Sequence, residues 1–128
     1  MDIELLKSLN ILYVEDEKEV ADELIHNFKF FVNNITYCEN GQEGLTKYFE
    51  KQNEINIIIT DVLMPVLDGK GMVDEIRLMS KNIPIIYTTA FNNAEFIEYI
   101  KGQNLIEHVS KPIDLEELFL SILKLINK

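Results

Sequence analysis

The sequence has little of what several protein classes need. It contains one cysteine, Cys38, so an internal disulfide is impossible and a disulfide-stapled fold is excluded. A lone cysteine in an apolar stretch is more often a half-buried strand residue than a reactive thiol. No hydrophobic run approaches the roughly 18 residues that suggest a membrane span. The opening MDIELLKSLN has no basic leader and does not resemble a secretion signal. We expect a cytoplasmic protein without membrane contact.

Basic residues are also scarce. Lysine and arginine number 12 against 22 aspartates and glutamates, which gives a net charge of −10. Such a surface repels phosphate backbones, so we expect no direct nucleic-acid binding. No proline- or glycine-rich linker divides the 128 residues, and no internal repeat is visible. The length predicts a single domain over residues 1–128.

Short apolar runs alternate with amphipathic segments along the whole chain. Apolar runs predict strands over 10–16, 34–40, 55–60, 83–90 and 106–110. Helical spacing of apolar residues predicts helices over 17–31, 41–52, 69–80, 93–101 and 114–127. Phe31 and Phe49 fall on the apolar stripes of the first two helices. Alternation of this kind predicts an α/β protein whose five-stranded parallel sheet is covered by helices on both faces.

Polar residues follow four of the predicted strands. Ligand chemistry in such a sheet gathers at the carboxyl ends of the strands. The residues at those ends are Glu15 and Asp16, Asp61, Thr89 and Lys111. Each has an ordinary explanation alone, because acids favour the first turn of a helix and threonine packs well in strands. Their joint arrangement is much harder to reach by chance.

Three carboxylates at one edge repel each other, by roughly 4 kcal/mol for two unit charges about 4 Å apart at an effective dielectric near 20. The cluster therefore needs a cation or a protonated member. An oxygen-rich site with few ligands suits Mg²⁺ beside a phosphoryl group. Carboxylate, ammonium and hydroxyl groups around a hard cation are the parts of a phosphoryl-transfer site.

Four motifs then resemble a known family, the response regulator receiver domain of two-component signalling. They are LYVEDE, ITDVLMPVLDG, IIYTTA and HVSKP, in the family's order and over nearly the whole chain. The resemblance implies a flavodoxin-like (βα)5 fold with strand order 2-1-3-4-5. It also implies a signalling domain rather than an enzyme that turns over a substrate.

The resemblance assigns roles to individual residues. Asp61 matches the phosphoacceptor. The Mg²⁺ ligands it implies are Glu15, Asp16, Asp61 and the backbone carbonyl of Leu63. Thr89 and Lys111 match the groups that contact the phosphoryl oxygens, and the Lys111–Pro112 bond is expected to be cis. Thr89 and His108 stand at the switch positions, although the family usually carries Tyr or Phe where this chain has His108.

By the same resemblance, a sensor histidine kinase or a histidine phosphotransfer protein would phosphorylate Asp61. The surface around strands 83–90 and 106–110 and their helices would then shift toward a downstream output domain or partner protein. The chain could be a stand-alone regulator or a piece of a longer one. Leu63 and Phe91 stand where polar side chains would orient a hydrolytic water, so we expect a long-lived acyl phosphate.

Three other functions fit these residues less well. A receiver-like domain that only binds partners would need damage in the acidic set, and none is visible. A haloacid-dehalogenase-type phosphatase needs a second aspartate two residues after its nucleophile, where this chain has Leu63. A dinucleotide-binding sheet needs a glycine-rich turn after the first strand, where this chain has EDEKE.

Overall fold

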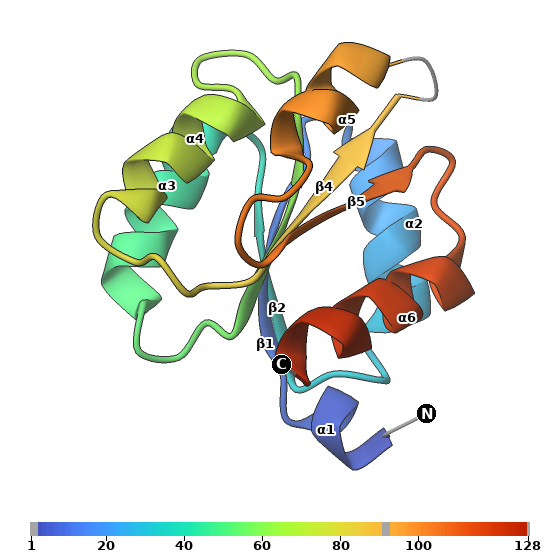
Figure 1. Cartoon of the computed structure of the whole chain (residues 1–128). Helices are drawn as coiled ribbons and strands as arrows, with labels where there is room; N and C mark the ends of the chain where they lie inside the picture. Colours follow the sequence, from blue (N-terminus) through green and yellow to red (C-terminus); the bar gives the residue numbers. More distant parts are fainter. Residues whose placement is uncertain (1–2, 91–92, 128) are drawn as a thin grey trace.

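A computed structural model describes residues 3–90 and 93–127 of the chain. Its centre is a parallel sheet of five strands in the order β2-β1-β3-β4-β5 (Figure 1). The bounds are β1 Asn10–Val14, β2 Asn34–Cys38, β3 Ile57–Asp61, β4 Ile85–Thr89 and β5 Ile106–Ser110. The predicted fold class and strand order are confirmed.

Helices cover both faces of this sheet. Their bounds are α1 Ile3–Lys7, α2 Lys18–Phe28, α3 Gly41–Lys51, α4 Gly69–Arg77, α5 Ala94–Ile100 and α6 Leu115–Ile126. One apolar core joins α1, α2 and α6 to one face, and a second joins α3, α4 and α5 to the other. Figure 1 shows α2 and α6 on the opposite side of the sheet from α3 and α4.

The central strands explain why the sequence reads as unbroken apolar runs. Every residue of β3 and β4 is buried, because successive side chains point to opposite faces and both faces are covered. In β1, Ile11 and Tyr13 join the core beneath α2 and α6, whereas Leu12 and Val14 join the other core. Strand β2 lies at the edge, where three of its five residues are only half-buried.

The sequence-based prediction was wrong in several local respects. Helix α4 ends at Arg77 rather than at residue 80. The short helix α1 was not predicted, although its Leu6 is buried in the core. Helix α2 ends at Phe28 rather than at residue 31. Phe31 therefore lies beyond the helix and is 45% exposed, and Phe49 on α3 is 37% exposed. The ring of Phe31 packs edge-on against Phe119 of α6, at 5.2 Å between centroids, so only part of it is covered.

Polar caps set the helix starts at the carboxyl edge of the sheet. Asn40 accepts a hydrogen bond from the Glu43 amide at the start of α3, and Asp68 accepts one from the Gly71 amide at the start of α4. Asp114 caps α6 by accepting hydrogen bonds from the Glu116 and Glu117 amides. After α5 the chain turns at Gly102, whose φ of 80° lies in the left-handed region that glycine adopts without strain.

Candidate functional site

The acidic residues meet where the sequence placed them. Asp61 is the last residue of β3, and Glu15 and Asp16 follow β1 directly. Carboxylate oxygens of these three residues lie within 4.8 Å of one another. Asp61 and Glu15 are buried, whereas Asp16 is exposed. The cluster thus consists of two buried carboxylates and one carboxylate that faces solvent.

Lys111 joins the two buried acids. Its Nζ donates a hydrogen bond of 2.8 Å to Asp61 Oδ2. The same nitrogen lies 2.9 Å from Glu15 Oε1 as an ion pair whose angle does not suit a hydrogen bond. One ammonium against three carboxylates leaves the cluster negative, so it retains an attraction for a cation.

The remaining oxygen of each buried acid is held by the backbone. Asp61 Oδ1 accepts a 2.7 Å hydrogen bond from the Val62 amide, and Glu15 Oε2 accepts one of 3.0 Å from the Glu17 amide. Tyr37 adds a 2.6 Å hydrogen bond from its hydroxyl to the Glu15 carbonyl. Each carboxylate is therefore fixed in rotation, with one oxygen on the backbone and the other turned toward Lys111.

Burial and charge perturb the pKa values here. Burial raises the pKa of Glu15, against the opposing effects of the Glu17 amide and of Lys111. Burial alone would lower the pKa of Lys111, but its pairing with Asp61 and with Glu15 outweighs burial and raises that pKa. The lysine is thus held in its charged form beside Asp61.

The donor set fits a magnesium ion. All three side chains offer carboxylate oxygens, which hard cations prefer, and their close spacing suits one small ion. The exposed Asp16 carboxylate has no hydrogen bond or ion pair to any described residue, so it is available as a ligand.

The loop between β3 and α4 carries an unusual turn. The Leu67 amide donates a 2.9 Å hydrogen bond to the Pro65 carbonyl, which closes a three-residue γ-turn around Val66. Val66 has a φ of 71°, the positive-φ form of this turn that is rare and strained. Its side chain is 81% exposed, and Leu63 nearby is 71% exposed. This loop therefore presents apolar side chains to solvent beside Asp61.

The other predicted residues lie at the same edge or on adjoining strands. Thr89 ends β4 and is fully buried, and its neighbour across the sheet is Ser110 of β5. His108 on β5 is half-buried and pairs in register with Tyr87. The Lys111–Pro112 peptide bond is cis. Phe91 lies outside the described residues.

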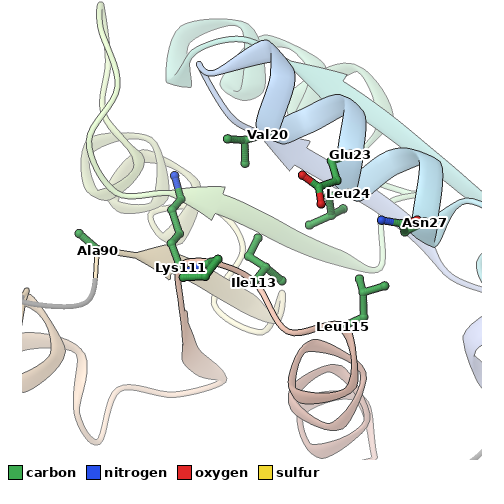
Figure 2. Close-up of a pocket in the computed structure, with 9 residues that line it drawn as sticks. Val20, Glu23, Leu24, Asn27, Ala90, Lys111, Ile113 and Leu115 are labelled. Atoms are coloured by element: carbon green, nitrogen blue, oxygen red, sulfur yellow. The ribbon is translucent and has the colours of Figure 1, made fainter.

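A groove opens beside the acidic cluster, between α2 and the segment that follows β5 (Figure 2). Its volume is about 500 Å³. Most of its lining is apolar, and Figure 2 shows Lys111 at the end nearest Ala90 and Glu23 on the wall that α2 forms. The lining comprises Val20, Glu23, Leu24, Asn27, Ala90, Lys111, Pro112, Ile113 and Leu115.

Sequence reasoning missed two residues that hold this framework together. One is Tyr37, which reaches across from β2 to the Glu15 carbonyl. The other is Arg77 at the end of α4, whose guanidinium donates to the carbonyls of Ser80, Ile83 and Asn104. In the sequence, an arginine near the end of a helix suggests an exposed surface charge. Its role could not be predicted, because the three carbonyls come together around it only in the folded chain.

Comparisons with known proteins agree with this geometry. The response regulator receiver domain family matches residues 11–123, so the chain belongs to this family. Response regulator SaeR of Staphylococcus aureus is 28% identical over 119 residues, which cover 93% of this chain and 51% of that protein. The chain therefore spans about half the length of the curated relatives that it matches.

Solved structures show the same fold. The two-component transcriptional regulator AraC from Clostridium phytofermentans superposes with a TM-score of 0.76 at 28% identity, covering 94% of this chain and 93% of that one. The structure of a CheX-CheY-BeF3-Mg²⁺ complex from Borrelia burgdorferi superposes with a TM-score of 0.82 at 25% identity. The match covers 94% of this chain and 90% of that one. A receiver domain from Clostridium thermocellum superposes with a TM-score of 0.85 at 24% identity, and the match covers 93% of this chain and 94% of that one. At that identity the likeness shows the fold alone.

Among residues 3–90 and 93–127, no helix has the length and apolar character needed to cross a bilayer.

Proposed function

We propose that this receiver domain accepts a phosphoryl group on Asp61 from a sensor histidine kinase or a histidine phosphotransfer protein. The observation that carries the proposal is the pair of hydrogen bonds that hold the Asp61 carboxylate. One of its oxygens is fixed by the Val62 amide, and the other is paired at 2.8 Å with Lys111. We also propose that residues 1–128 act as one domain and that the protein works in the cytoplasm, where such kinases present their phosphohistidine.

The transfer is a simple displacement at phosphorus. An oxygen of Asp61 forms a new P–O bond as the P–N bond of the donor phosphohistidine breaks, and the bonding electrons return to the donor imidazole, which takes up a proton. Lys111 pairs with a phosphoryl oxygen, and the Thr89 hydroxyl donates to another. A Mg²⁺ ion bound by Glu15, Asp16, Asp61 and the Leu63 carbonyl would supply charge neutralisation at the phosphoryl oxygens.

The groove beside Lys111 is the proposed docking place for a helix of the phosphodonor. It is apolar and ends next to the lysine that contacts Asp61, so a helix seated there brings its histidine to the carboxylate. The net charge of −10 and the position of Glu23 favour a donor surface with basic residues. After transfer, movement of Thr89 toward the phosphoryl group would shift the β4-α5-β5-α6 surface toward an output domain or partner.

Intact-mass measurement after incubation with acetyl phosphate and Mg²⁺ tests the proposal. Wild-type protein should gain one phosphoryl group, and Asp61→Asn should gain none. Asp114→Asn, which alters an aspartate at the start of α6, is the matched control and should behave as wild type. If Asp61→Asn is phosphorylated as well as the control, Asp61 is not the acceptor.

A further inference from the structure

Five buried side-chain polar atoms have no hydrogen-bond partner among the described residues. Two of them, the hydroxyl oxygen of Thr89 and Nδ1 of His108, lie on the neighbouring strands β4 and β5. Buried polar atoms in native proteins are nearly always paired with protein or with ordered water. Each of these two atoms therefore needs a partner.

The two side chains lie on the same face of the sheet. Tyr87 and Thr89 are two residues apart on β4, so they point to one side. His108 is the register partner of Tyr87 on the adjoining strand β5. Tyr87 in turn packs against Phe96 of α5, with 4.7 Å between ring centroids. Thr89 and His108 thus lie on neighbouring strands, on the face that α5 covers, and are offset by two residues in the strand register.

Lys111, which follows β5, does not supply the missing partners. The Lys111 amide donates to the carbonyl of Thr89, at 2.8 Å, and not to its hydroxyl. The Lys111 ammonium is engaged by Asp61 and Glu15. A buried water molecule can supply both partners, because a protein of this length encloses roughly five waters, which typically bridge such atoms.

We propose that one buried water joins Thr89 to His108 in the unphosphorylated protein. The Thr89 hydroxyl donates to the water, and the water donates to His108 Nδ1, so the imidazole carries its proton on Nε2. This inference rests on the proposed function, in which the same hydroxyl donates to the phosphoryl group. A hydroxyl has one proton, so His108 competes with the phosphoryl group for it and acts as a positioning residue that holds Thr89 in the resting state.

Nitrogen NMR of the neutral imidazole tests the bridge without any phosphorylation. The chain has two histidines, and the exposed His26 serves as an internal reference. We expect His108 Nδ1 to be unprotonated and to show the shift of a hydrogen-bonded acceptor. Thr89→Val removes the hydroxyl at nearly constant shape, so it should move the chemical shift of Nδ1 toward that of a nitrogen without a hydrogen bond. Thr89→Ser keeps a hydroxyl and should restore the wild-type chemical shift. A proton on Nδ1, or the same shift in wild type and Thr89→Val, overturns the inference.

Binding of beryllofluoride with Mg²⁺ tests the competition. His108→Phe removes the acceptor while keeping a ring, and should tighten binding by roughly two- to tenfold, the usual net effect of one hydrogen bond. In the Thr89→Val background the same change at His108 should have no effect. An equal effect in both backgrounds means that His108 does not act through the hydroxyl.

The two tests also separate this inference from the proposed function. If wild-type protein does not bind beryllofluoride and Asp61→Asn behaves identically, the proposed phosphorylation site is wrong. The NMR comparison of Thr89→Val with Thr89→Ser still decides whether the bridge exists.

Discussion

The α-carbon of Gly69 lies so close to the carbonyl group of Asp61 that a β-carbon at position 69 would overlap the Asp61 carbonyl oxygen. The Gly69 amide also donates a 2.8 Å hydrogen bond to the Val62 carbonyl. Helix α4 therefore begins directly on the end of β3, which fixes the backbone that carries the candidate phosphoacceptor. No side chain can move to relieve a clash with this carbonyl.

We expect Gly69→Ala to destabilise the protein by about 2–3 kcal/mol, as overpacking of a tight site does. Gly71→Ala in the same helix is the matched control, because its added carbon meets mainly the flexible end of Leu67. Alanine also favours helix at that position. Urea unfolding of the two variants is the measurement. Equal stabilities for the two variants would contradict the close contact at Gly69.

The strained γ-turn at Val66 offers a gain in stability. A β-branched residue at a φ of 71° is an outlier, whereas asparagine tolerates this region. Because the Val66 side chain is 81% exposed, little packing is lost on replacement. Val66→Asn should raise the free energy of unfolding by about 1 kcal/mol. Val66→Thr keeps the branch and should give no gain, and a gain of the same size in Val66→Thr would show that strain is not the cause.

The parallel sheet was predictable because five apolar runs alternate with helical patterns along the whole chain. The strand order followed from the resemblance of the motifs around Asp61 and Lys111 to the receiver family. The helix cap at Asp114 and the left-handed turn at Gly102 depend on local sequence, so features of this kind can be indicated by a sequence pattern.

What could not be predicted depends on contacts distant in sequence. Helix α1 is only five residues long, too short to form by itself, and exists because Leu6 is buried against the core. The strain at Val66 arises because Gly41 and Gly69 tie down both sides of its loop. The partial exposure of Phe31 follows from where α2 stops, and helix ends are the least certain feature of any apolar pattern.

If Mg²⁺ binds the acidic cluster as proposed, it should stabilise the unphosphorylated protein, because the unfolded chain does not bring these carboxylates together. At ten times its dissociation constant a ligand contributes about 1.4 kcal/mol, which raises Tm by a few degrees. Asp16→Asn should weaken this response and should be at least as stable as wild type without metal, because it removes one crowded charge. Calorimetry with and without Mg²⁺ gives the metal-free stability of each protein and the increase in Tm that Mg²⁺ causes. Glu19→Gln on α2 is the control, and equal losses in both variants would place the ion elsewhere.

Cys38 should be nearly inert toward thiol reagents at neutral pH. Burial, aided by the charge of Glu43, raises the pKa of its thiol from the usual 9.0 to about 11. Its reaction with a disulfide reagent at pH 8 should be at least about a hundredfold slower in the folded protein than in denaturant, because the thiolate is the reactive form.

The raised pKa of Cys38 also has a consequence for stability. A group whose pKa is higher when folded stabilises the protein fully below its unfolded pKa, and that contribution is lost as pH rises toward about 11. Cys38→Ser should abolish the reaction and flatten this alkaline loss. Equal rates for folded and denatured protein would contradict the burial of the thiol.

The lifetime of the proposed acyl phosphate should depend on Leu63. Its side chain is 71% exposed beside Asp61 and cannot hydrogen-bond a water, whereas hydrolysis needs a water held in line with phosphorus. Leu63→Asn supplies a polar group at that place and should hasten dephosphorylation, at most by about the hundredfold typical of a positioning group. Leu63→Val keeps the side chain apolar and controls for packing. The decay of phosphorylated protein in excess Mg²⁺, after removal of the donor, is the measurement. If Leu63→Asn decays no faster than Leu63→Val, the apolar side chain does not set the lifetime.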